Sequence, residues 1–228
     1  MWYNVRKILQ RGNFMMKRIK LFLLLVLTFI FCCACGSEAN GIVEEENLSE
    51  LVSIVDEYFY VDSIGQAKHA LIVKNNSSKT VKISNNITAK DASDKTIGAG
   101  TGSIDGVASG VEACVVTEVY DVVGVTDFEC SLTIEEDTRN VPVTQNILFE
   151  QSLVGEKVIV TCTNNNEEDV KNLEVVALFF REGKFVYYGI NWIQEIKAGG
   201  TVAIEVHARE SYTEKMTYDD VKIFLSEM

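Results

Sequence analysis

An internal repeat with a constant spacing of 89 residues is the feature that most constrains how this chain can fold. The tripeptide beginning at Lys74 precedes the one beginning at Thr163 by that distance, and both end in Asn-Asn. The same spacing relates Leu71 to Val160, Val73 to Cys162, Val81 to Val170, Gly100 to Gly189, Ile104 to Ile193 and Val107 to Ile196. One inserted residue then gives a spacing of 90, which matches Gly110 with Gly200, Ala113 with Ala203, Cys114 with Ile204 and Val116 with Val206. Two homologous domains are therefore predicted.

Each repeat has the pattern of short strands separated by turns. Apolar residues alternate with polar ones from Phe128 to Ile134, from Val202 to Val206 and from Val221 to Leu225. Clusters rich in Asn, Ser, Gly and Lys separate such runs. Six or seven strands per repeat are typical of an immunoglobulin-type β-sandwich. Only residues 48–58 also fit a helix; otherwise they form the first strand.

We therefore expect an all-β protein with two tandem immunoglobulin-like β-sandwiches. The first spans residues 47–137 and the second spans residues 144–228. The linker at 138–143 contains Pro142, the only proline in the chain.

The first 35 residues have the pattern of an export signal. The basic stretch Lys17–Lys20 precedes an apolar run, Leu21–Cys33, which is shorter than the roughly 20 residues of a bilayer span. Cys35, followed by Gly-Ser, resembles the lipidated cysteine of bacterial lipoproteins. In that family the cysteine is diacylated and becomes the first residue of the mature chain. Cys32 and Cys33 depart from the usual lipobox, so the choice among the three cysteines stays open, as does an ordinary cleaved signal or an uncleaved anchor.

The segments on either side of this signal have simple interpretations. A signal of normal proportions begins at Met16, so we expect translation to start there rather than at Met1. Residues 36–46 are polar and acidic and lack aromatic side chains, which predicts a solvated tether.

The charge of the exported part excludes a class of partners. Six of the 21 basic residues precede Cys35, so 15 basic residues face 33 acidic ones from there on. A duplex nucleic-acid binder needs basic residues that displace phosphate counterions. We therefore expect no nucleic-acid partner. The membrane, reached through the lipid anchor, and an envelope protein or glycan remain as partners.

A stretch of the second repeat resembles the motif of FxLYD-domain proteins. That motif has an apolar residue, any residue, Leu-Tyr-Asp, a two-residue turn and Gly-Lys. Here Val176–Phe180 is followed by Arg-Glu and Gly-Lys, with Phe180 in place of Asp. The first repeat has Ile87–Asp91 at the same place, which keeps the Asp and loses Leu-Tyr. The resemblance spans both repeats. It implies an extracytoplasmic immunoglobulin-like sandwich, often on lipoproteins, with no catalytic residues and no agreed ligand.

Residue types that could carry catalysis or bind a metal have no recognisable arrangement in the sequence. His69 and His207 are the only two histidines, and nothing in the sequence places them together. No nucleophile or zinc-protease motif occurs. The acidic clusters Asp91/Asp94, 167–169 and Asp219/Asp220 lack the spacing of a calcium loop and are interpreted as solvated turns. We expect no catalytic residue, no metal site and no cofactor.

The glycines of the first repeat and the cysteines of both repeats each have two interpretations. The glycine-rich residues 98–103 match the strand-like residues 187–192 of the second repeat, which favours a glycine-rich strand or bulge over a phosphate loop. Cys114, Cys130 and Cys162 fall at apolar positions and are expected to be buried free thiols. The alternative is a Cys114–Cys130 disulfide joining the last two strands of the first repeat.

The aromatic residues of the second repeat are the candidate binding surface: Phe185, Tyr187, Tyr188 and Trp192. Successive side chains of a strand point to opposite faces, so some of these rings are expected to be exposed. Alternatively they pack a seam between the domains or a sandwich edge. The sequence thus predicts a membrane-anchored, non-enzymatic binding or scaffolding module of the cell envelope. The alternatives are a carbohydrate-active enzyme and a pure spacer or assembly subunit.

Overall fold

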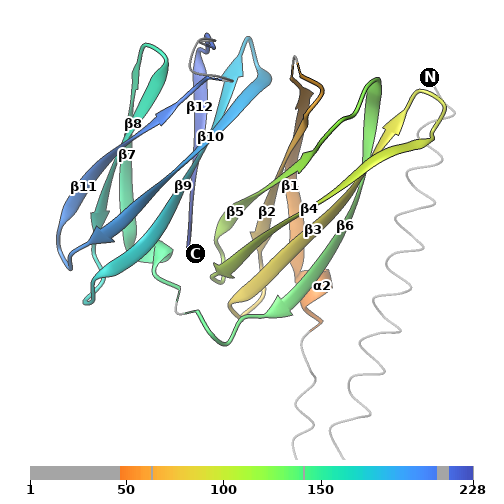
Figure 1. Cartoon of the computed structure of the whole chain (residues 1–228). Helices are drawn as coiled ribbons and strands as arrows, with labels where there is room; N and C mark the ends of the chain where they lie inside the picture. Colours follow the sequence, from red (N-terminus) through yellow and green to blue (C-terminus); the bar gives the residue numbers. More distant parts are fainter. Residues whose placement is uncertain (1–46, 63, 141, 210–215, 228) are drawn as a thin grey trace, which may run out of the picture. The chain divides into compact units, whose positions relative to one another are not determined.

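The structure, a computed structural model, describes residues 47–62, 64–140, 142–209 and 216–227 (Figure 1). The predicted signal, Cys35 and the tether lie outside the described residues. Within the described ranges, no helix has the length and apolar character needed to cross a membrane.

Antiparallel strands account for nearly all the regular structure, which confirms the all-β prediction (Figure 1). The first repeat comprises α2 (Leu48–Leu51), β1 (Val52–Val61), β2 (Ala67–Asn75), β3 (Val81–Asp91), β4 (Thr96–Val107), β5 (Glu112–Val119) and β6 (Val125–Glu136). The second comprises η1 (Thr144–Asn146), β7 (Ile147–Val154), β8 (Lys157–Asn164), β9 (Val170–Arg181), β10 (Lys184–Ile196), β11 (Thr201–His207) and β12 (Asp220–Glu227). The segment 48–58, for which a helix was the alternative, forms one helical turn and then a strand.

The same strand pairing occurs in both repeats. The sheet β1-β2-β5 corresponds to β7-β8-β11, and β4-β3-β6 corresponds to β10-β9-β12. A pair between Glu227 on β12 and Asp105 on β4 joins the latter two into one six-stranded sheet. The part of the chain that contains both repeats forms one compact unit, so the division into two domains stays a prediction.

A buried asparagine explains why the 89-residue spacing is so regular. The Nδ2 group of Asn75 donates to the carbonyl oxygens of Lys79 (2.8 Å) and Val107 (2.9 Å). Asn164 makes the same two bonds, to the carbonyl oxygens of Glu168 (2.9 Å) and Ile196 (3.0 Å). Both asparagines are fully buried. Each therefore satisfies carbonyl groups from two other segments that water cannot reach.

The predicted change of spacing from 89 to 90 is wrong. The amide of Gly110 donates to the carbonyl of Asn75, and the amide of Gly199 donates to that of Asn164. Both glycines have positive φ, 77° and 68°. Gly110 therefore corresponds to Gly199, and the spacing remains 89 into β5 and β11. A second glycine at position 200 had suggested the extra residue.

The glycine-rich segment 98–103 lies within β4, which confirms the strand interpretation. A Cβ atom on Gly100 would lie 2.4 Å from the carbonyl oxygen of Glu118, and one on Gly102 would lie 2.3 Å from that of Val116. Both distances are far inside van der Waals contact. Glycine is thus required because the backbones of β4 and β5 approach each other closely.

Replacing Asn75 by alanine is expected to lower the free energy of unfolding by about 2–4 kcal/mol, because two buried carbonyls lose their donor. Urea denaturation would measure this. The control is Asn76→Ala at the exposed neighbouring position, which should change stability far less. Equal effects of the two substitutions would contradict the role assigned to Asn75.

Candidate functional site

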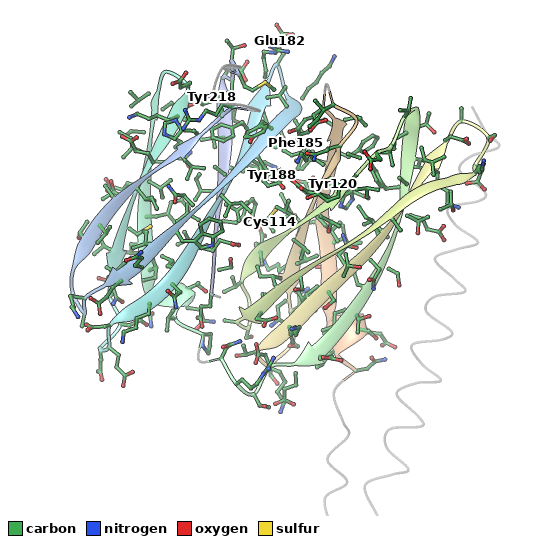
Figure 2. The ribbon with its side chains drawn as sticks, viewed as in Figure 1. Cys114, Tyr120, Glu182, Phe185, Tyr188 and Tyr218 are labelled. Atoms are coloured by element: carbon green, nitrogen blue, oxygen red, sulfur yellow. The ribbon has the colours of Figure 1, made fainter. Side chains whose placement is uncertain are left out.

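The outer face of the β1-β2-β5 sheet packs against side chains of β9, β10 and β12, and we call this interface the inter-repeat seam. Its buried members are Ala70, Ile72 and Cys114 from the first repeat and Val176, Leu178, Phe180 and Phe185 from the second. Figure 2 shows Cys114, Phe185 and Tyr188 between the two groups of strands. Tyr58 meets Phe180 edge to face, with ring centroids 5.0 Å apart. The seam is thus packed like a protein core.

A carboxylate lies at one margin of the seam. Lys68, Tyr120 and Tyr188 all bond to Glu118, and Tyr188 is the partner from the second repeat. Burial raises the pKa of Glu118, but its bonds to Lys68 and the two tyrosines outweigh that effect and hold the pKa below its ordinary value. Burial and the neighbouring carboxylate raise the pKa of Tyr188 well above its usual range. The tyrosine therefore remains a hydrogen-bond donor at neutral pH.

A second polar contact crosses the seam. Lys222 Nζ donates to Asp56 Oδ2 at 2.9 Å and to the Tyr58 hydroxyl at 2.8 Å. The hydrogen bond from Lys222 is the largest influence on Asp56 and lowers its pKa. The two repeats are thus joined by specific bonds as well as by apolar packing.

The four aromatic residues predicted as a binding surface have different environments. Phe185, only 8% exposed, is buried in the seam, and Tyr188 packs beside it. Tyr187 packs against the core of the second repeat. Trp192 is 48% exposed, and its Nε1 group donates to Glu174 Oε2 at 3.0 Å. Of the four, Trp192 is the one that presents a large exposed surface.

A bulge in β10 explains why two of these rings share a face. The register with β9 shifts between Phe185 and Tyr187. In a regular strand, residues three apart point to opposite faces, whereas the extra residue brings Phe185 and Tyr188 to the same one. Strand alternation read from the sequence could not locate this shift.

The edge strands β1 and β7 both carry exposed apolar side chains that the sequence did not predict: Ile54, Val55, Phe59 and Val61 on β1, and Leu148, Phe149, Leu153 and Val154 on β7. All seven residues after Ile147 in β7 are exposed. Alternating exposure is absent from the rest of β7, because side chains on both of its faces are exposed.

Three side chains that the sequence separates meet at one edge of the first repeat: Glu57 on β1, His69 on β2 and Cys130 on β6. His69 Nε2 lies 2.8 Å from Glu57 Oε1 and 3.5 Å from Cys130 Sγ, and the thiol donates to the same carboxylate oxygen at 3.2 Å. We call these residues the Glu-His-Cys cluster. They are the one group in the described residues with three converging metal-ligand types.

The charge state of the cluster follows from its surroundings. Burial, followed by the bond to Glu57, raises the pKa of the Cys130 thiol to about 12. For Glu57, burial raises the pKa, but the bonds from His69 and Cys130 outweigh it and lower the pKa overall. At neutral pH the cluster therefore holds a carboxylate and a protonated thiol. No sequence motif brings His69 near the other two ligands, because the three residues come from three different strands.

The alternative of a Cys114–Cys130 disulfide is wrong. Both thiols are free, as is Cys162. Cys114 faces outward from β5 into the inter-repeat seam, whereas Cys130 contacts His69 inside the first repeat. The β1-β2-β5 sheet lies between them, so no bond can form without refolding a strand.

The acidic clusters singled out in the sequence take part in local turn and ion-pair contacts. Asp91 accepts from the amides of Ser93 and Lys95 within its own turn, and Asp169 pairs with Lys197. A pocket lined by Ile104, Ala113, Leu225 and their neighbours has room for about one water molecule. This pocket is too small for a sugar ring.

Comparisons with known proteins identify no family for this chain. No protein-family model matches the chain, and no curated protein matches it. Three solved structures of Bacteroides uniformis β-glucuronidases are similar at a low level. β-Glucuronidase 2 covalently bound to cyclophellitol-6-carboxylate aziridine is 13% identical, with a TM-score of 0.19 over 62% of this chain and 21% of that one.

A calcium-binding mutant of β-glucuronidase 2 is 15% identical, covering 69% of this chain and 24% of that one, with a TM-score of 0.18. A further β-glucuronidase structure is 14% identical, with a TM-score of 0.18 over 65% of this chain and 23% of that one. This chain thus spans about a quarter or less of those proteins. Similarity at this level carries no argument about function.

Replacing Tyr188 by phenylalanine is expected to lower the free energy of unfolding by about 1–3 kcal/mol, because a part-buried bond to a carboxylate is lost. Tyr120→Phe is the matched control: it removes a bond to the same carboxylate from an exposed ring and should cost less than about 0.5 kcal/mol. Urea denaturation of both variants measures the difference.

The effect of Tyr188→Phe should depend on pH. The pKa of Glu118 is lower in the folded state than in the unfolded state, so its contribution is present above the unfolded value and is lost as pH falls through the folded value. The stability difference between wild type and variant should therefore shrink in acid. A difference that stays constant down to strongly acidic pH would contradict the role of the Glu118 carboxylate.

Proposed function

We propose that this protein is a lipid-anchored, extracytoplasmic module of the cell envelope that binds or positions a protein partner without catalysis. The export signal ending at Cys35 supports the anchor. The packed inter-repeat seam supports a rigid body, because its contacts hold both repeats in one compact unit. The observation that carries the binding role is the exposed apolar edge strand β7.

Strand β7 has the features of a surface that another protein covers. It lies at the edge of the β7-β8-β11 sheet, so one row of its backbone groups has no partner among the described strands. Edge strands are normally protected by lysine, proline or a covering element. The sequence of β7, ILFEQSLV, has neither lysine nor proline, and Leu148 is 64% exposed. A partner that adds a strand here would pair the backbone and cover the apolar side chains.

A pure spacer would need no such strand, and this distinguishes the two roles. Crosslinking of the full chain in intact cells, followed by mass spectrometry, should identify one protein joined through residues of β7. The variants Leu148→Arg and Leu153→Arg should abolish that crosslink. Ile64→Arg is the matched control, because Ile64 is an exposed isoleucine in the turn between β1 and β2.

Two outcomes would overturn parts of this proposal. A partner whose crosslinks are unaffected by both arginine variants would show that β7 is not the contact surface. The absence of any protein crosslinked to β7 would favour a spacer or glycan-binding role.

The anchor has its own test. Cys35→Ala should release the protein from the membrane fraction while the body keeps its cooperative unfolding transition. Cell fractionation with immunoblotting measures the release. Retention of the Cys35→Ala protein in the membrane would contradict lipidation at Cys35 and direct the next test to Cys32 and Cys33.

A further inference from the structure

We propose that the Glu-His-Cys cluster is a binding site for a divalent transition-metal ion of the zinc type, with one coordination position open to solvent. The site lies outside the contact surface proposed above, and its argument is independent of that surface.

The spacing of the ligand atoms fits a tetrahedral ion. The three pairwise distances among Glu57 Oε1, His69 Nε2 and Cys130 Sγ are 2.8, 3.2 and 3.5 Å. Tetrahedral zinc with bonds of about 2.0–2.3 Å separates its ligand atoms by about 3.3–3.6 Å. Outward shifts of about 0.5 Å or less therefore convert the hydrogen-bonded cluster into a coordination shell. Carboxylate, imidazole and thiolate are all ligands of zinc in proteins.

The fold holds these three ligands in place and leaves the site accessible to an ion from solvent. His69 is fully buried, and Phe128 packs against its ring with centroids 5.3 Å apart. Glu57 has an exposed side chain. Glu57 lies on β1 and Cys130 lies on β6. Each of these strands is an edge strand of its sheet. An ion here would connect the sheets at their open edge, with water as its fourth ligand.

A second observation concerns the other nitrogen of the imidazole. Among the described residues, the buried His69 Nδ1 has no hydrogen-bond partner. Thr117 lies opposite His69 on β5, and its buried Oγ1 also has no partner. A metal on Nε2 requires the proton on Nδ1, where metal-ligating histidines donate to an outer partner. Directly opposed side chains on paired strands are neighbours, so Thr117 is a polar side chain next to His69, but the two atoms form no hydrogen bond in this structure.

The second repeat shows that the fold does not need these polar side chains. Val158 takes the place of His69 at the 89-residue spacing and is fully buried. Glu57 pairs with Leu71, and Gln151 pairs with Val160, which is the residue that matches Leu71 at the 89-residue spacing. Gln151 therefore occupies the position of Glu57, and an amide replaces the carboxylate. The second repeat thus packs an apolar side chain at the position where the first repeat has a buried histidine. This asymmetry favours a ligand over a structural requirement.

Metal binding releases one proton from the cluster. On binding, the Cys130 thiol releases one proton to solvent and becomes a thiolate ligand. His69 exchanges the proton of Nε2 for one on Nδ1, and Glu57 remains a carboxylate. No oxidant or reductant is needed.

The test is a titration of the reduced full-length chain with Co²⁺, in a background where Cys32, Cys33 and Cys35 are replaced by serine. One equivalent should give the absorption of tetrahedral, thiolate-bound cobalt, and Zn²⁺ should displace it. Glu57→Gln and Cys130→Ser should each weaken binding by more than about tenfold. His69→Val, which copies the second repeat, should abolish binding while the protein remains folded.

Two control variants make the result specific. Cys162→Ser changes a thiol in the core of the second repeat, and Glu205→Gln changes a carboxylate 3.5 Å from His207 with no thiol beside it. Both should bind Co²⁺ as the parent does. The proposal is overturned if no thiolate-bound cobalt spectrum forms, or if the spectrum survives Cys130→Ser.

Discussion

Strands β2 and β5 of the β1-β2-β5 sheet are buried on both faces, and the rest of the structure depends on that burial. One face covers the core of the first repeat, and the other forms the inter-repeat seam. In β2 only Lys74 escapes full burial. A sheet covered on both faces cannot follow the usual alternation of apolar and polar residues, so β2 reads as a continuous apolar run from Ala70 to Val73. The buried side chains of Lys68 and His69 need hydrogen-bonding partners within the protein, because little water reaches them.

Those partners give the seam and the cluster their chemistry. Lys68 points to the seam and bonds to Glu118, the carboxylate that also holds Tyr188 of the second repeat. His69, the next residue, points to the opposite face and meets Glu57 and Cys130. Two adjacent residues of one buried strand thus have different roles. Lys68 bonds to the carboxylate that joins the repeats, and His69 lies at the centre of the proposed metal site. The alternation of side chains along β2 separates the two functions.

The two repeats share a framework and differ where function is proposed. Asn75 and Asn164 make the same pairs of buried bonds, so the turns that they organise have been kept. The outward face of β2 is covered by the second repeat, whereas the edge strands β1 and β7 both leave apolar side chains exposed. The two edge strands therefore differ in one respect: β1 supplies Glu57 to the Glu-His-Cys cluster, whereas the corresponding position on β7 is Gln151.

The sequence alone determined the all-β class, the repeat and most of its spacing, because alternation and turn residues are local signals that each strand carries by itself. It also indicated that residues 98–103 form a strand, since they match the strand-like residues 187–192 of the second repeat. Only the tertiary structure decided which faces are covered. The bulge in β10 places Phe185 and Tyr188 in the seam, and three separate strands bring Glu57, His69 and Cys130 together. Both results depend on how strands pair and pack across long separations in the chain, and no local pattern of residues encodes such contacts.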